Sequence, residues 1–228
     1  MKYKIIIAYD GTDYQGWQKQ KDGSTIAGIM QKIFFKVFNE EISLFGASRT
    51  DAGVHANGQV ATFKTSHLIP INKMLSAWNN KLPASIIIKS IETVSDTYNP
   101  HHHIIEKTYE YTFSLERPAP CVARYQWYYR WPINLAKLKE ATKIFVGTHN
   151  FRSFCTGNDL KDTVRTITHI SLRHIENQTY TITFKGPGFL RYMIRRIVGA
   201  FLEVASRPNL PISYLKKILE SGWEIDMF

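Results

Sequence analysis

The residues best suited to chemistry lie in one short stretch, Gly46 to Ala56, with the sequence GASRTDAGVHA. It places an arginine, one carboxylate and a histidine (Arg49, Asp51 and His55) between two apolar, strand-like segments. In an extended chain, Arg49 and Asp51 point to the same side because side chains alternate with a period of two. The guanidinium would then keep the carboxylate ionised and oriented. The alternative is a turn in which Asp51 and a glycine only reverse the chain.

A second candidate site lies at the start of a helix that the spacing of apolar residues predicts from Leu190 to Ala205. Its apolar arc consists of Leu190, Met193, Ile194, Ile197, Val198, Phe201 and Leu202. At about 100° per residue, Arg195 falls at the rim of this arc and Arg196 faces away. A half-buried guanidinium needs an acidic partner, and Asp51 is the candidate. The alternative is that Arg195 extends to solvent.

Two aromatic segments are open to two interpretations each. The stretch Gly11 to Gln18 (GTDYQGWQ) lacks the Lys and Ser or Thr of a phosphate-binding loop. It is either a glycine-hinged turn or a loop that contacts RNA through Tyr14, Trp17 and Lys19.

In Lys107 to Phe113 (KTYEYTF), alternation places Tyr109 on one face with Tyr111 and Phe113. Such a face usually packs in a core, but Tyr109 lies at the strand's start, where it can also support an extruded base.

Metal and cofactor chemistry find little support. The run His101-His102-His103 cannot direct three consecutive side chains at one ion on an extended chain. The sequence contains no G-x-S-x-G and no G-x-G-x-x-G motif. We therefore predict an enzyme with one catalytic carboxylate, no metal and no cofactor.

Composition indicates a polyanionic partner. The 228-residue chain is 44% hydrophobic, with 29 Lys and Arg against 19 Asp and Glu, a net charge of +10. Each neutralised phosphate releases counterions, so nucleic acid is the expected ligand. There is no apolar run long enough to span a membrane and no signal peptide, so we expect a cytoplasmic protein. Cys121 and Cys155 lack metal-site spacing and are expected to be reduced thiols.

The remaining elements predict an α+β fold of two ferredoxin-like (split βαβ) halves, with antiparallel or mixed sheets and a cleft between them. The first domain (1–97) carries the Asp51 loop, and the second covers 98–228. In the first, strands are expected at Tyr3–Tyr9, Ile42–Ser48, Gln59–Lys64 and Ile86–Val94, and helices at Ile26–Phe38 and Ile71–Lys81. In the second, strands are expected at Glu106–Ser114, Thr163–Arg173 and Thr179–Lys185, and helices at Asn134–Phe145, Leu190–Ala205 and Pro211–Ser221.

Five motifs in this order resemble the TruA family of tRNA pseudouridine synthases. They are Tyr9–Gln18, Ser48–Ala56, Lys107–Tyr111, Gly147–Phe151 and Phe189–Gly199. The resemblance implies isomerisation of uridine to pseudouridine at positions 38, 39 and 40 of the tRNA anticodon stem-loop. It also implies a homodimer with one tRNA lying across both subunits. Because the family's last segment does not follow Phe228, we expect the second domain to lack the family's last strand.

The same resemblance implies a role for each catalytic residue. Asp51 matches the catalytic aspartate, which attacks the base or its ribose so that the uracil detaches, rotates and rejoins through carbon 5. Arg49 matches the arginine that enters the stem and helps to extrude the base, Arg195 the partner of the aspartate, and Tyr109 the ring that stacks on uracil. RNA contacts are expected from Tyr14, Trp17, Lys19, His55, Arg191 and Arg196. The competing hypothesis is a tRNA-binding or folding-assistance protein with weak or no catalysis.

Overall fold

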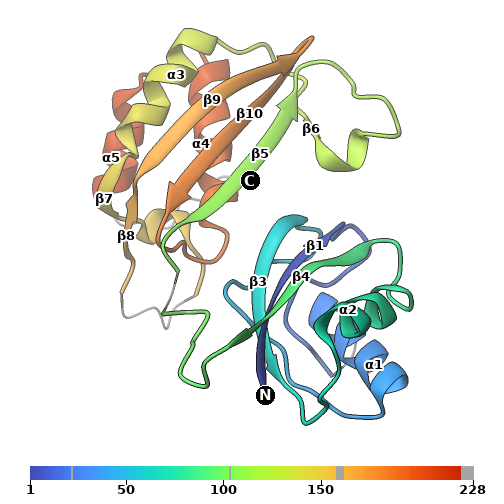
Figure 1. The fold of residues 1–228 in the computed structure, drawn as a ribbon. Coiled ribbons are helices and arrows are strands. Elements are labelled where there is room, and N and C mark those ends of the chain that lie inside the picture. Colours follow the sequence, from blue (N-terminus) through green and yellow to red (C-terminus); the bar gives the residue numbers. More distant parts are fainter. Residues whose placement is uncertain (22, 103, 158–161, 222–228) are drawn as a thin grey trace. The chain divides into compact units, whose positions relative to one another are not determined.

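The computed structural model describes residues 1–21, 23–102, 104–157 and 162–221, so His103 of the histidine run lies outside the description. The chain forms two compact units, Met1–Ile104 and Ile105–Phe228, each with its own sheet and its own helices (Figure 1). Each unit is described by itself. The mixture of helices and antiparallel sheets confirms the predicted α+β class.

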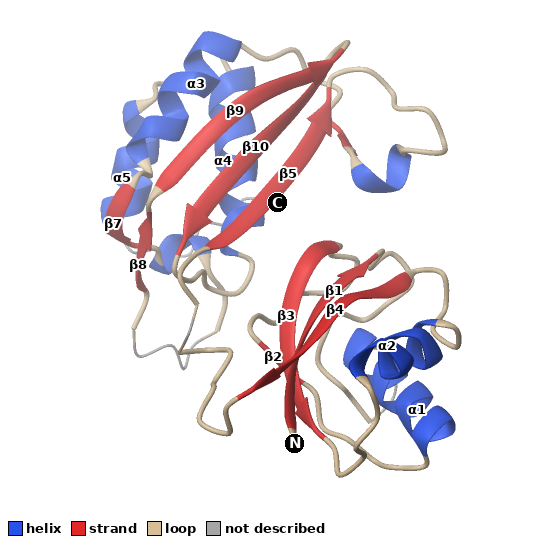
Figure 2. Ribbon diagram, in the orientation of Figure 1, coloured by secondary structure: helices blue, strands red, loops and turns tan. Residues whose placement is uncertain are grey.

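The first unit is one four-stranded sheet with two helices. Its elements are β1 (Lys2–Tyr9), α1 (Ile26–Phe38), β2 (Phe45–Gly46), β3 (Ala56–Lys64), α2 (Ile71–Asn79) and β4 (Ile86–Val94). The strand order is β2-β3-β1-β4, and each neighbouring pair is antiparallel. Both helices lie on the same face of this sheet (Figure 2). This is the ferredoxin-like arrangement that the order of elements predicts.

Alternating burial fixes which face of β1 meets the helices. Ile5 and Ile7 are fully buried, and their neighbours along the strand are only partly covered. On α1, Met30 and Phe34 are four residues apart, so they lie on one face of the helix, and both are fully buried. Thr25 caps this helix by accepting a hydrogen bond from the Gly28 amide at 3.2 Å.

The second unit repeats the pattern with additions. Its elements are β5 (Lys107–Ser114), β6 (Trp127–Tyr128), α3 (Leu135–Ile144), β7 (Gly147–Asn150), β8 (Val164–Ile167), β9 (His169–Glu176), β10 (Thr179–Gly186), α4 (Met193–Ser206) and α5 (Ser213–Ser221), with short 3₁₀ turns at Ala123–Tyr125 and Arg152–Phe154. One sheet has the order β6-β5-β10-β9, and β7 and β8 form a separate hairpin. The helices α3, α4 and α5 lie on one side of the larger sheet (Figure 2).

Aromatic side chains fill much of the core of this second unit. Phe145 contacts Phe154 and Phe201 edge to face, with ring centroids 5.1 Å and 5.0 Å apart.

The strand β5 lies near one edge of the larger sheet. On its outer side, the part of the chain that the structure describes supplies only β6, which pairs with Phe113 and Ser114. Most of that edge of β5 therefore has no strand partner among the described residues.

Several predicted boundaries are wrong, among them the start of the strand expected from Gln59, which begins at Ala56. The strand expected over Ile42–Ser48 is reduced to Phe45–Gly46, and the strand expected over Thr163–Arg173 is two strands that meet at Thr168. The long helix begins at Met193 instead of Leu190, after Tyr192 in a left-handed conformation (φ 60°). None of the helices in the described ranges is both long and apolar enough to cross a membrane.

Candidate active site

The Asp51 loop connects β2 to β3 in the first unit and contains no strand between residues 47 and 55. The extended strand that the alternation argument assumed is therefore absent, because the chain bends and turns through this stretch, and the pairing of Arg49 with Asp51 stays a prediction. A turn closes where the Val54 amide donates to the Asp51 carbonyl at 3.2 Å, with Gly53 at φ +75°. Asp51 is half-buried and Arg49 is exposed.

The loop that follows β1 holds the Asp51 loop from both sides of the aspartate. Before Asp51, the Trp17 amide donates to the Thr50 carbonyl at 3.1 Å, and the Tyr9 hydroxyl lies 2.8 Å from the Thr50 hydroxyl. After Asp51, the Gly53 amide donates to the Tyr14 carbonyl at 3.2 Å. The motif around Gly11–Gln18 thus acts as the scaffold of the carboxylate loop.

Two glycines make this close approach of two backbones possible. A Cβ on Gly16, which has φ +87°, would lie 2.5 Å from the Thr50 carbonyl oxygen and 3.1 Å from the Asp51 carbonyl carbon. A Cβ on Gly11 would overlap the Val54 carbonyl. Neither position accepts a side chain unless the Asp51 loop moves.

This scaffold role corrects two predicted RNA contacts. Trp17 is 1% exposed and Tyr14 is 8% exposed, so neither ring is available to stack on a base. The Tyr14 hydroxyl instead lies 2.6 Å from the Ser85 hydroxyl. Lys19, the third residue of that prediction, is exposed.

His55 is engaged within the first unit. Its Nδ1 lies 3.0 Å from the Asp10 carboxylate and 3.1 Å from the Gly11 amide. The histidine predicted to contact RNA thus links the Asp51 loop to the end of β1. The sequence alone offered no signal for this pairing, because the two residues are far apart along the chain.

In the second unit, Tyr109 is half-buried against Phe189, with ring centroids 5.2 Å apart in an edge-to-face contact. Tyr111 follows on the same strand face, where burial raises the pKa of its hydroxyl and the positive charge of Arg195 lowers it in part. Arg195 therefore lies within electrostatic reach of Tyr111.

Lys107 begins the same strand face and was not singled out from the sequence. Burial lowers the pKa of its ammonium group. A partly desolvated lysine beside a candidate stacking tyrosine is a group that an RNA phosphate would stabilise.

The helical-wheel assignment of the two arginines is reversed in the structure. Arg195 is exposed, whereas Arg196 is partly buried and donates through Nη1 to the carbonyls of Ser153 and Cys155, at 3.5 Å and 3.2 Å. Backbone carbonyls in and just after the 3₁₀ turn therefore hold one nitrogen of the partly buried guanidinium. Arg196 thus has a structural role, and its predicted RNA contact stays a prediction. The predicted ion pair of Arg195 with Asp51 joins residues of different units and stays a prediction.

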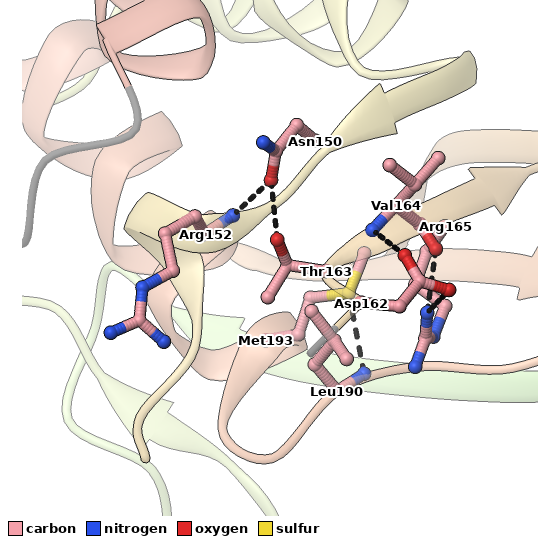
Figure 3. Close-up of polar contacts among 8 residues, drawn as sticks. All are labelled: Asn150, Arg152, Asp162, Thr163, Val164, Arg165, Leu190 and Met193. Atoms are coloured by element: carbon pink, nitrogen blue, oxygen red, sulfur yellow. Dashed lines mark hydrogen bonds and ion pairs between the residues drawn. The ribbon is translucent and has the colours of Figure 1, made fainter. Parts of the chain in front are cut away.

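Asn150, the last residue of β7, holds the chain on both sides of the hairpin through its side chain (Figure 3). Asn150 accepts hydrogen bonds from the Arg152 amide at 3.1 Å and from the Thr163 hydroxyl at 2.6 Å. The Leu190 amide lies 3.5 Å from the Met193 sulfur, which closes the turn that leads into the helix. These contacts explain the asparagine of the Gly147–Phe151 motif as a structural residue.

The last predicted contact, Arg191, is exposed just before α4. Its guanidinium stacks on the neighbouring Tyr192 ring, 4.9 Å from the centroid. Among the residues that the structure describes, no group of three or more His, Cys, Asp or Glu is arranged to hold a metal ion.

Comparisons with known proteins define the class. A model of the tRNA pseudouridine synthase family matches residues 5–100 and 141–224, which include Asp51 and Arg195, while Tyr109 lies between the two matched stretches. The chain therefore belongs to the family of tRNA pseudouridine synthases, which are isomerases.

Individual relatives are similar in sequence to nearly the whole of this chain. A tRNA pseudouridine synthase A of Thermodesulfovibrio yellowstonii is 36% identical over 96% of this chain and 90% of its own length. A tRNA pseudouridine synthase A 2 of Clostridium perfringens is 39% identical, with the same coverage of both chains. The tRNA pseudouridine synthase A of Brevibacillus brevis is 36% identical over 96% of this chain and 89% of its own.

Proposed function

We propose that this protein converts uridine to pseudouridine at positions 38, 39 and 40 of the tRNA anticodon stem-loop, with Asp51 as the nucleophile. The observation that carries the residue assignment is the Asp51 loop. It presents a half-buried carboxylate between Thr50 and Gly53, which are both fastened to the loop after β1. A carboxylate held in this way needs little reorganisation when a substrate arrives.

The reaction is an isomerisation that balances without a cofactor. The bond between ribose C1′ and uracil N1 breaks, the uracil rotates, and C1′ bonds to C5. The proton leaves C5, and N1 ends with a proton. The Asp51 carboxylate forms the transient covalent bond, either to the base or to the ribose, which divides one difficult step into two easier ones.

The target base must leave the helical stack before it reaches a carboxylate. We assign its extrusion to Arg49, which is exposed two residues before Asp51 and so is available to enter the stem. We assign stacking on the uracil to Tyr109, whose ring packs against Phe189 in an edge-to-face contact. Arg195, which is exposed, is assigned to pair with the aspartate and steady its charge.

Phosphate contacts would supply most of the affinity for tRNA. The net charge of +10 supports this, and Lys19 and Arg191 are exposed cations on the loops next to the proposed catalytic residues. We also propose that the enzyme acts as a homodimer in the cytoplasm, where one tRNA lies across both subunits.

The loss of hydrogen from C5 provides the test. We expect an unmodified tRNA transcript with tritium at uridine C5 to release tritium into water when it is incubated with the protein. Transcripts that keep uridine at only one of positions 38, 39 and 40 should each release it, and a transcript with cytidine at all three should not. Release from that last transcript would contradict the assignment to the anticodon stem-loop.

A further inference from the structure

The His55 ring connects the end of the Asp51 loop to the start of the loop that supports it. Its Nδ1 lies 3.0 Å from Asp10 Oδ1 and 3.1 Å from the Gly11 amide nitrogen; it donates to Asp10 when it carries a proton and accepts from the Gly11 amide when it does not. The same Asp10 oxygen accepts from the Thr12 amide at 3.0 Å and from the Thr12 hydroxyl at 2.6 Å. A single carboxylate oxygen therefore fixes the turn after β1 and meets the ring at the start of β3.

We propose that Asp10 and His55 are positioning residues, which hold the Asp51 loop in the geometry that catalysis needs. The proposal rests on the proposed function, in which Asp51 is the nucleophile. In this role neither residue needs to touch the substrate, and it replaces the RNA contact predicted for His55.

The arrangement of the other contacts shows why this pair matters. Thr50 is fixed by Tyr9 and Trp17 on the side before Asp51. On the side after it, the Gly53 amide makes one long contact of 3.2 Å to Tyr14. His55 thus ties the exit of the loop to the turn at Asp10 through its side chain. It does so directly before Ala56, where pairing with Tyr9 begins the ladder between β3 and β1.

The pair should affect catalysis far more than stability. The side chains of His55 and Asp10 are 32% and 20% exposed, and partly exposed ion pairs contribute little to folding. A displacement of about 1 Å in a catalytic group, in contrast, lowers a rate by roughly a hundredfold. Removing a contact that only stabilises the fold would instead lower the unfolding free energy clearly and leave kcat almost unchanged.

The test compares His55→Ala with His55→Asn in the full chain. Asparagine places its side-chain amide near the position of Nδ1, so it retains a donor for Asp10 or an acceptor for the Gly11 amide. We expect His55→Ala to lower kcat by roughly tenfold to a hundredfold, with KM for tRNA changed less than about twofold, and His55→Asn to recover most of kcat. Failure of His55→Asn to exceed His55→Ala would overturn the proposal.

The first unit offers a matched control in His67. Its Nε2 lies 3.4 Å from the Glu40 carboxylate and 2.8 Å from the Phe38 carbonyl, and its side chain is 36% exposed. His67→Ala removes a similar contact away from the Asp51 loop and should leave kcat unchanged. An equal loss of kcat in His67→Ala and His55→Ala would reduce the pair to a general stabilising contact, against the proposal.

A second pair of variants tests whether the two residues act together. Asp10→Asn keeps an oxygen for the Thr12 contacts but removes the charge that faces His55. Asp10→Asn should lower kcat, as His55→Ala does. The double variant, with both changes, should be no slower than His55→Ala alone. Additive losses would contradict a shared role. A loss of tRNA affinity in His55→Ala with kcat intact would make His55 an RNA contact instead.

Hydrogen exchange tests the positioning role without activity. In His55→Ala, the Gly53 and Val54 amides should exchange faster than in the wild type, while core amides of β1 are unchanged. Unchanged exchange at Gly53 and Val54 would overturn the proposal even if kcat fell. If the wild type forms no pseudouridine, the proposed function fails, and the exchange comparison still decides whether the pair fixes the loop.

Discussion

Gly16→Ala should displace the Asp51 loop and lower the unfolding free energy of the protein. Gly16 has φ +87°, and an added Cβ would lie 2.5 Å from the Thr50 carbonyl oxygen. The left-handed backbone costs an alanine about 1–2 kcal/mol, and losing the hydrogen bond from Trp17 to Thr50 costs about 0.5–1.5 kcal/mol. The lower unfolded-state entropy of alanine offsets about 0.4–1 kcal/mol. The expected net loss is about 2 kcal/mol of unfolding free energy.

Gly53→Ala is the matched control, because Gly53 also has a positive φ (+75°) but no atom lies within 4 Å of its added Cβ. Its expected loss is about 1 kcal/mol or less. Urea unfolding of both variants measures the difference, and single-turnover tritium release measures the rate. We expect Gly16→Ala to be both less stable and slower, by roughly a hundredfold for a shift near 1 Å. Equal stability of the two variants would refute the close backbone contact from which the site is built.

Three further changes test other parts of the account. Tyr9→Phe removes the 2.8 Å contact to the Thr50 hydroxyl, so unfolding free energy should fall by about 1 kcal/mol, and kcat should fall more than KM rises. Arg195→Met removes the positive charge that lowers the pKa of Tyr111; an NMR titration of the tyrosine hydroxyls should show that pKa rising further, and an unchanged value would place Arg195 elsewhere. Lys107 has a pKa lowered by burial, so its charge destabilises the folded state in full below that lowered pKa, and the penalty disappears as the pH rises from there to the ordinary pKa of lysine. Lys107→Met should accordingly raise Tm near neutral pH while it weakens tRNA binding, and a lower Tm would contradict the burial argument.

The elements with strong periodicity could be predicted from the sequence. The residues of α1 repeat their apolar positions at helical spacing and follow a capping Thr25, and its predicted bounds, Ile26–Phe38, are confirmed. The bounds of β4 at Ile86–Val94 are likewise confirmed. The order of elements in the first unit was enough to predict the arrangement of its sheet, since few topologies join two such βαβ segments without crossing.

The site was predicted less well, because side-chain environment depends on contacts between distant segments. Tyr14 and Trp17 belong to a polar, glycine-rich segment, a composition typical of a solvent-exposed loop. In the structure this segment makes backbone hydrogen bonds to Thr50 and Gly53, and both rings are buried. Arg196 was assigned to solvent because it lies opposite the apolar arc on the helical wheel, and a wheel does not contain the carbonyls of a separate 3₁₀ turn. The pairing of His55 with Asp10 had no periodic signal at all.

The central claim is that Asp51 is the nucleophile, and the most direct measurement compares Asp51→Asn with Asp13→Asn. Asp13 is an exposed carboxylate on the neighbouring loop, so its variant controls for the loss of one negative charge. With saturating enzyme and an unmodified tRNA transcript, we expect wild type and Asp13→Asn to release tritium from C5 at similar rates. Asp51→Asn should bind the transcript and release none. Tritium release by Asp51→Asn at the wild-type rate would contradict the account and would favour a different nucleophile.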